Sequence, residues 1–413
     1  MKIRDLASLV SFALAPIALA ACGTQDGSIA KDQIGTTTQP VIAGEDSTVD
    51  QNAVVLLVHY SPSTGEFGQC TGTLLTPKLV LTARHCVSDT DESAACDSKG
   101  NPVGGSGAVK GDNNAEDMYV FTGVTRPDFG RGKVTPAGQG AKIITDGATN
   151  LCNHDIALIE LADAVEGAMI APINLKEPPT KGEEITSVGW GVTDKTQQPT
   201  TRQQRPNVEI IGVGGDSRGS GMAVAPNEFL VGEAICSGDS GGPALNQDGA
   251  VIGVVSRGGN GQGSRGAAGC IGGENLYTQV APFKDMILAA YEEVGQKPWN
   301  DGSPNPTLAT FGEKCSEDAE CQSNVCEEGK CNQDCSKTKC KSGYTCEKMS
   351  GRKVCVVEKK EDPTAEETAD DTTEAAPSTT TSGGCSTTSN PSSNGVGGLL
   401  LAAGLVMARR KKR

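Results

Sequence analysis

Residues 236–243 read Cys-Ser-Gly-Asp-Ser-Gly-Gly-Pro, and this stretch limits the possible folds and functions more than any other part of the chain. Glycine accepts backbone dihedrals that strain other residues, and its missing Cβ lets main-chain N–H groups approach a ligand closely. A serine among glycines is a candidate nucleophile, because the oxyanion formed by its attack needs hydrogen-bond donors already in place. We therefore predict that Ser240 is a nucleophile and that the N–H groups of Gly238 and Ser240 are the oxyanion donors.

A nucleophilic serine needs a base, and the base needs a carboxylate to orient it. Of the three histidines, His85 follows an apolar run in Leu-Thr-Ala-Arg-His-Cys, and Asp155 opens the strand-like segment Asp-Ile-Ala-Leu-Ile-Glu-Leu. The order His85, Asp155, Ser240 and the motifs around these residues resemble those of the chymotrypsin/trypsin-like serine proteases. The resemblance covers about residues 41–295.

The resemblance implies an all-β catalytic domain of two six-stranded antiparallel barrels with a C-terminal helix. It also implies a serine endopeptidase that acts on protein or peptide substrates without a cofactor or metal. In that family His85 would be general base and then acid, Asp155 would orient it, and Ser240 would attack. Two alternatives stay open: an inactive homologue that serves as an adhesin or binding module, and an esterase or other acyl hydrolase with the same triad.

Local residue patterns agree with this fold. The β-branched and apolar run at 53–60 predicts a strand in which His59 is a packed residue. Residues 70–86 look like two strands around a Thr-Pro turn, and residues 156–161 alternate like a strand with one buried face. The Val-Gly-Trp-Gly segment at 188–191 resembles the strand that begins the second barrel. Apolar residues at helical spacing across 283–294 predict the terminal helix.

Substrate preference is inferred from the register with the family. Ala234 stands six residues before Ser240, at the base of the S1 pocket, where members that prefer Arg or Lys have an aspartate. The resemblance assigns Ser256 and Gly258 to substrate binding and Asn275 to the pocket wall, where glycine is common. We therefore expect a small or medium uncharged P1 residue and no Arg/Lys specificity.

The Val-Ile-Ala-Gly segment at 41–44 resembles the mature N-terminus of the family. There, cleavage frees an α-amino group that folds inward and pairs with the aspartate before the nucleophile. Val41 and Asp239 are therefore the expected activation pair of a zymogen, because a buried ammonium must be paired. Pro40 precedes this point, whereas the family's activating enzymes usually cut after Arg or Lys, so the identity of the activating protease stays open.

The net charge of −15 argues against nucleic acid as a partner, since counterion release needs clustered Lys and Arg. Apart from Cys22 and Cys385, the 16 cysteines divide into six in the protease region and eight between residues 315 and 355. These even counts favour disulfides and a compartment outside the cytoplasm. Within the protease region we expect the bridges Cys70–Cys86, Cys96–Cys152 and Cys236–Cys270.

Two local features depart from the family pattern. Arg84 replaces the family's small residue before His85, and we expect its side chain to point to solvent. Residues 88–117 are polar and look like a surface insertion. Carboxylates cluster there without a clear liganding spacing, so calcium binding stays open while no metal site is assigned.

The chain is expected to divide into seven segments. Residues 1–21 look like a signal peptide ending in a lipobox, which makes Cys22 the expected lipidation site. A pro-segment (22–40), the protease domain (41–297), a linker (298–312), a disulfide-rich module of undetermined connectivity (313–356) and a disordered acidic Thr/Ser-rich linker (357–383) follow. Residues 384–413 resemble the sorting tags of myxobacterial surface proteins, with a short apolar segment and a basic tail. We expect an exported protein, either secreted or held at the bacterial cell envelope or outer surface by the lipid or the tag.

Overall fold

The computed structural model describes residues 41–358, apart from 131–133, 194–195, 197, 217–220 and 263–268. The expected signal peptide, the lipidation site Cys22, the pro-segment, most of the acidic linker and the sorting tag lie outside the described residues. Within the described part of the chain, no helix combines the length and the apolar character that a membrane crossing requires.

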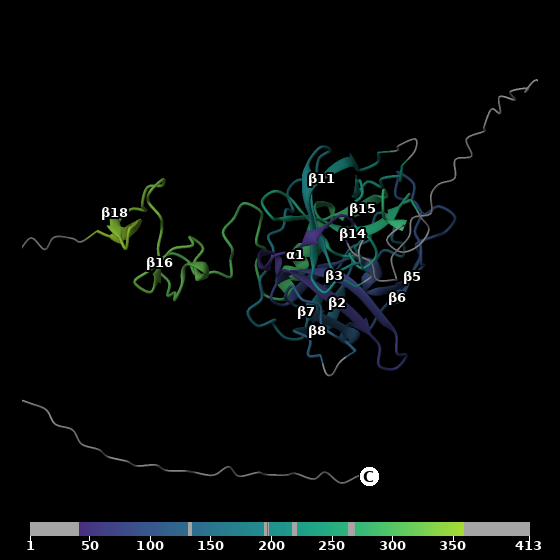
Figure 1. Cartoon of the computed structure of the whole chain (residues 1–413), viewed down its shortest axis with the longest axis horizontal. Coiled ribbons are helices and arrows are strands. Elements are labelled where there is room, and N and C mark those ends of the chain that lie inside the picture. Colours follow the sequence, from purple (N-terminus) through teal and green to yellow (C-terminus); the bar gives the residue numbers. More distant parts are fainter. Residues whose placement is uncertain are drawn as a thin grey trace, which may run out of the picture. The chain divides into compact units, whose positions relative to one another are not determined.

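Six antiparallel strands close into a first barrel in the order β2-β3-β4-β9-β8-β7. Its interior is an apolar cluster that includes Val55, Leu57 and Val80, because alternate residues along each strand point inward. Figure 1 shows β2, β3, β7 and β8 as the purple and blue group. The strands are β2 (Val54–Tyr60), β3 (Phe67–Thr76), β4 (Leu79–Thr82), β7 (Met118–Phe121), β8 (Gly138–Ile144) and β9 (Ala157–Leu161).

A second barrel follows in the order β11-β10-β13-β14-β15-β12, and a pairing of β12 with β11 closes it. The short strand β1 (Glu45–Asp46) adds to β11 from outside. Figure 1 shows β11, β14 and β15 together in teal and green. The strands are β10 (Glu184–Gly189), β11 (Gln203–Val213), β12 (Glu228–Val231), β13 (Pro243–Leu245), β14 (Val251–Gly259) and β15 (Glu274–Gln279). The prediction of two six-stranded antiparallel barrels is confirmed.

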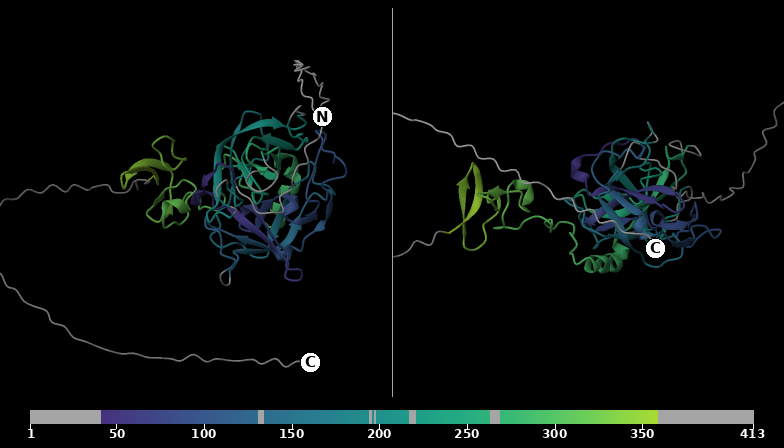
Figure 2. Two further views of the ribbon diagram at one scale, coloured as in Figure 1. Left: turned by 45° about the vertical axis from the view of Figure 1, so that its right-hand side comes forward. Right: turned by 90° about the horizontal axis from the view of Figure 1, so that it is seen from below.

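An apolar cluster shared by both barrels holds them together. It joins Leu79 and Leu81 of the first barrel to Val254 of the second, and the helix α1 (Lys284–Glu293) adds Ile287 and Tyr291 to it. Each fully buried apolar side chain contributes about 1.5–3 kcal/mol. Figure 2 shows α1 as the green coil at the edge of the barrels, and it is the terminal helix expected from the apolar spacing at 283–294.

The insertion after His85 is a folded loop that carries a small hairpin of β5 (Ser88–Thr90) and β6 (Val109–Asp112). This hairpin corrects the expectation for Arg84, whose side chain is buried and points to the insertion instead of solvent. Arg84 Nε donates to Ser88 Oγ at 2.8 Å, and Arg84 Nη2 lies 2.6 Å from Asp112 Oδ1. Short 3-10 turns of the catalytic domain include Val49–Gln51, Arg84–Cys86, Ala115–Asp117 and Ala281–Phe283.

The disulfide-rich segment forms two small hairpins, β16 (Cys326–Glu327) with β17 (Lys330–Cys331) and β18 (Tyr344–Met349) with β19 (Arg352–Val357). A 3-10 turn at Asp318–Glu320 precedes them. Few of its apolar residues are buried, so covalent links of about 2–4 kcal/mol each supply much of its stability. The four bonds are Cys315–Cys326, Cys321–Cys331, Cys335–Cys346 and Cys340–Cys355.

Candidate active site

Asp155 and His85 meet between the two barrels. Asp155 lies just before β9, and His85 lies in the 3-10 turn that follows β4, the strand paired with β9. The Nδ1–H of His85 donates to Asp155 Oδ2 at 2.8 Å, and the backbone N–H of His85 donates to Oδ1 at 3.0 Å. Both oxygens of one carboxylate therefore fix the position and the tautomer of the imidazole.

Asp155 is fully buried, yet the carboxylate form is favoured. Burial raises its pKa, but the electrostatic interaction with His85, the hydrogen bonds from the His85 and Ser256 side chains and the His85 N–H together outweigh burial. The net result is a pKa of Asp155 below its ordinary value. Ser256, on β14 of the second barrel, donates its hydroxyl hydrogen to Asp155 Oδ2 at 2.7 Å.

Ser240 lies in the loop before β13, against the His85 turn. Its carbonyl oxygen accepts the N–H of Thr71 at 2.8 Å and lies 3.6 Å from Sγ of Cys86, the residue after His85. Gly238 has a φ of +97°, a conformation that glycine reaches without steric cost. Thr71 Oγ1 donates to the Gly238 carbonyl at 2.9 Å, so strand β3 of the first barrel anchors both ends of the Gly238–Ser240 segment.

The remaining ring nitrogen of His85, Nε2, is buried and has no hydrogen-bond partner among the residues described. Ser240 therefore lies near the imidazole without a hydrogen bond to it. In structures without substrate, catalytic hydrogen bonds are often long and tighten only when substrate binds. A free Nε2 next to a serine is what a general base needs before it accepts the serine proton.

Asp239 is buried directly beside Ser240. Its two carboxylate oxygens accept the N–H groups of Gly191 and Cys236, each at 3.0 Å. Burial raises the pKa of Asp239 well above its ordinary value, against these hydrogen bonds and the charge of Arg126. Val41 is also fully buried, but no hydrogen bond or ion pair joins it to Asp239 in the described structure.

Of the residues expected around the S1 pocket, Ser256, Gly258 and Asn275 lie on the adjacent strands β14 and β15, and Ala234 lies in the segment after β12. Ala234 is fully buried, and its carbonyl accepts the Ile42 N–H at 3.2 Å. Gly258 on β14 pairs directly with Asn275 on β15. Asn275 is buried, and its Nδ2 donates to the Gly232 carbonyl at 2.8 Å.

A cavity of about 370 Å³ is lined in part by His85. Its lining includes His59, Glu66, Phe67, His85 and Asp89. The cavity therefore borders His85 and is partly open to the surface.

All three expected bridges are bonded in the structure: Cys70–Cys86, Cys96–Cys152 and Cys236–Cys270. The groups of potential metal ligands found among the described residues are built from disulfide-bonded cysteines, joined in one case by His85. A cysteine binds metal as a thiolate, so these groups cannot hold an ion while the disulfides are intact. The clustered acids of the insertion form no such group in the part of the chain that is described.

Sequence reasoning missed one ion pair in the site. Arg257, which follows Ser256, points inward and forms a two-pronged bond with Glu228. Both side chains are at most 1% exposed. The only sequence signal for this pair is the arginine next to the serine expected to bind substrate. Glu228, the partner of that arginine, lies 29 residues away on another strand.

Comparison with known proteins agrees with the fold and the geometry. A family model described as trypsin matches residues 42–287. Phenoloxidase-activating factor 1 of Holotrichia diomphalia is 28% identical over 270 residues, which cover 60% of this chain and 68% of the relative. Snake venom serine protease serpentokallikrein-2 of Protobothrops mucrosquamatus is 26% identical over 265 residues, 61% of this chain and 87% of the relative. CLIP domain-containing serine protease B4 of Anopheles gambiae is 27% identical over 277 residues, 60% and 70% respectively.

The matched region spans more than half of the chain and contains both barrels, the start of the helix α1 and the histidine, aspartate and serine described above. These relatives are named as serine proteases in two of the three cases. The chain belongs to the trypsin family of serine proteases and is a serine-type endopeptidase that acts on protein or peptide substrates.

Proposed function

We propose that the chain is an exported endopeptidase, made as a zymogen, in which His85, Asp155 and Ser240 form the catalytic triad. The observation that carries this proposal is that both carboxylate oxygens of Asp155 accept hydrogen bonds from His85, while Sγ of Cys86, the next residue of the same turn, lies 3.6 Å from the Ser240 carbonyl oxygen. This arrangement leaves Nε2 as the one imidazole nitrogen free to exchange a proton with the nucleophile.

The reaction then follows from the positions of these groups. Ser240 Oγ bonds to the substrate carbonyl carbon as its proton passes to His85 Nε2, and the N–H groups of Gly238 and Ser240 hold the oxyanion. The imidazolium, stabilised by Asp155, returns the proton to the leaving amine as the peptide bond breaks. A water molecule then attacks the acyl-enzyme with His85 again as base, which releases the second product and restores Ser240.

Activation depends on the pairing of a freed Val41 α-amino group with Asp239. Two observations support this pairing: both residues are fully buried, and burial raises the pKa of Asp239 well above its ordinary value. A cation that reaches Asp239 would relieve the cost of its buried charge and would order the adjacent Gly238–Ser240 segment. An activating protease would supply the cut, because the chain has Pro40 before Val41.

The substrate pocket favours a small or medium uncharged P1 side chain. Ala234 supplies no charge at its base, and Ser256, Gly258 and Asn275 form its walls. Burial of Asn275 against the pocket strand reduces the space available to a long side chain. An arginine or lysine side chain at P1 would bury its charge in this pocket without an oppositely charged partner, which is energetically unfavourable.

Export is supported by the seven disulfides of the described residues, since such bonds persist outside the cytoplasm. We place the protein at the bacterial cell envelope or in the medium. The lipidated Cys22 and the tag at 384–413 are the two candidate anchors, and cleavage before Val41 would leave only the tag on the catalytic domain. Deletion of residues 384–413 should therefore release the active enzyme from the cells.

The test of the triad is labelling of the processed protein with a fluorophosphonate probe, which reacts with an activated serine. The wild-type protein should be labelled, and the Ser240→Ala and His85→Ala variants should not. The same preparation should hydrolyse peptides as well as simple esters of the same acyl group, whereas a control esterase should hydrolyse only the esters. A folded, processed protein that resists the probe, beside a control protease that reacts, would point instead to an inactive homologue with a binding role.

A further inference from the structure

A buried ion pair lies directly behind the carboxylate of Asp155. Arg257 Nη1 lies 2.7 Å from Glu228 Oε1, and Arg257 Nη2 lies 2.9 Å from Glu228 Oε2, so the planar guanidinium meets the carboxylate along both prongs. Glu228 begins β12, and Arg257 is on β14. Desolvating two charges costs several kcal/mol per ion, and their attraction rarely yields a net gain over an apolar pair. Stability alone therefore gives little reason for this pair to be here.

The pair contacts the candidate triad through Ser256. Arg257 Nη1 lies 3.2 Å from Ser256 Oγ, and the same hydroxyl donates to Asp155 Oδ2 at 2.7 Å. Neighbouring residues of a regular strand point to opposite faces, but β14 has an irregular register between Val255 and Arg257. Such a bulge re-aims a side chain, which lets Ser256 and Arg257 meet on one side of the strand.

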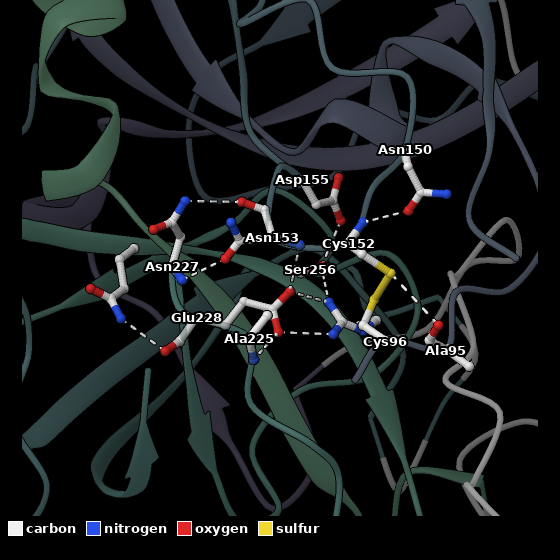
Figure 3. Close-up of polar contacts among 12 residues, drawn as sticks. Ala95, Cys96, Asn150, Cys152, Asn153, Asp155, Ala225, Asn227, Glu228 and Ser256 are labelled. Carbon is white, nitrogen blue, oxygen red and sulfur yellow. Dashed lines mark hydrogen bonds and ion pairs between the residues drawn. A yellow bond between two sulfur atoms is a disulfide. The ribbon is translucent and has the colours of Figure 1, made fainter. Parts of the chain in front are cut away.

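Glu228 also holds the backbone that leads to Asp155. One of its oxygens accepts the N–H of Asn153 at 3.3 Å, and the other accepts the N–H of Ala225 at 3.1 Å. Asn153 has a φ of +70°, and its Oδ1 accepts the N–H of Asn227 at 2.6 Å. Figure 3 shows Glu228 close to Asn153 and to the Ser256–Asp155 contact. The start of β12 in the second barrel thus forms hydrogen bonds with the segment of the first barrel that carries Asp155.

We propose that Arg257, anchored by Glu228, is a positioning residue that directs the hydroxyl hydrogen of Ser256 onto Asp155 and so fixes the carboxylate that orients His85. This role rests on the triad proposed above. The Ser256 hydroxyl can rotate and donate in other directions. An Arg257 N–H directed at its oxygen occupies a lone pair, which leaves the hydroxyl hydrogen aimed at Asp155. Because Glu228 neutralises the guanidinium charge, Arg257 can orient the Ser256 hydroxyl without adding a net charge next to Asp155.

The main test is the double variant Arg257→Met/Glu228→Gln, measured on a peptide substrate. The glutamine avoids the unpaired buried charge that Arg257→Met alone would leave, and its amide oxygen can still accept from Asn153 or Ala225. We expect kcat to fall by about tenfold with KM within about twofold, because the lost contact acts on the triad and not on the substrate. An unchanged kcat in the folded double variant would overturn the proposal.

A double-mutant cycle with Ser256→Ala separates positioning from general support of the fold. If Arg257 acts through the Ser256 hydroxyl, the double variant should lower kcat by less than about twofold once that hydroxyl is gone. A role confined to structure predicts equal losses in both backgrounds, and that result would contradict the proposal. The conservative variant Arg257→Lys keeps a charge opposite Glu228 but lacks the planar fork, so a drop in kcat of about threefold is expected even if the double variant does not fold.

Arg202 provides a matched control in the same barrel. It is also fully buried, but its guanidinium bonds to Ser47 Oγ and to the carbonyls of Thr48 and Val54, away from the site. Arg202→Met should lower the melting temperature and leave kcat of the folded enzyme unchanged. Fluorophosphonate labelling of the wild-type enzyme distinguishes failure of the proposed triad from failure of the proposed role of Arg257. An unlabelled wild type would refute the triad itself, whereas a labelled wild type with an unaffected double variant would refute only the role of Arg257.

Discussion

Asn275 stands directly opposite Gly258 in the register of β15 and β14, so close that a Cβ on Gly258 would lie 2.7 Å from Asn275 Oδ1. These two positions form facing parts of the expected S1 pocket. A side chain as large as asparagine at one of them narrows the space between the strands. In the pocket proposed above, Ala234 would exclude a charged P1 residue by electrostatics and Asn275 would exclude a large one by volume, so both favour a small uncharged P1 residue.

We predict that peptides with Ala, Ser or Val at P1 are cleaved with at least about 100-fold higher kcat/KM than those with Arg, because an unpaired buried guanidinium costs on the order of 3 kcal/mol. Asn275→Gly should raise kcat/KM for larger uncharged P1 residues. The double variant Ala234→Asp/Asn275→Gly should gain Arg hydrolysis, whereas Ala234→Asp alone should gain much less. Efficient cleavage after Arg by the wild type would contradict this account of the pocket.

The uncleaved chain should lose stability as pH rises through the titration of Asp239. The pKa of Asp239 is raised by burial in the folded state, above an ordinary value of 3.8. The folded state therefore holds this proton more tightly than the unfolded state, and its contribution to stability is complete below pH 3.8 and declines up to the folded pKa. Asp239→Asn should remove this decline.

The measurement is urea unfolding of the uncleaved protein from pH 4 to pH 8 in a Ser240→Ala background, which prevents self-digestion. The same series on protein cleaved before Val41 should show a weaker decline, because the freed α-amino group then favours the charged carboxylate. Identical pH profiles for cleaved and uncleaved protein would argue against the Val41–Asp239 pairing.

His154, next to Asp155, should titrate above its ordinary pKa of 6.5. His154 Nδ1–H donates to Asp146 Oδ2 at 2.5 Å, and this hydrogen bond raises the pKa of His154 against the opposing effect of burial. The stabilisation is therefore present below pH 6.5 and lost as pH rises through the folded pKa. NMR titration of His154 should show this shift, and Asp146→Asn should reduce it. Asp163→Asn, at an exposed acid elsewhere, should leave the titration unchanged.

The sequence predicted what depends on local pattern or on family motifs. A β-branched apolar run and a helical spacing of apolar residues are local properties, so the strand at 53–60 and the terminal helix were expected where the structure has them. Arg84 was placed in solvent because nothing near it in sequence shows that Asp112, in the insertion, folds back onto it. The Glu228–Arg257 pair was missed for the same reason. It depends on β12 and β14 flanking β15 and on a bulge, neither of which has a sequence signature.

Loss of either of two disulfides of the catalytic domain should have different effects: one loss should reduce stability more, and the other should reduce activity more. Cys96–Cys152 joins residues 56 apart and ties the insertion to the segment before Asp155, whereas Cys70–Cys86 joins residues only 16 apart and flanks His85. Because a longer loop loses more entropy when it is closed, the loop-entropy relation gives the first bond about 1 kcal/mol more stabilisation than the second.

We therefore expect Cys96→Ala/Cys152→Ala to lower the free energy of unfolding more than Cys70→Ala/Cys86→Ala, with denaturant unfolding as the measurement. Activity should show the reverse order. Cys86 Sγ lies 3.6 Å from the Ser240 carbonyl, so loss of the shorter bridge loosens the contact between the His85 turn and the nucleophile loop. If one pair of substitutions proves more harmful in both assays, the division between an anchoring bridge and a site-forming bridge is wrong.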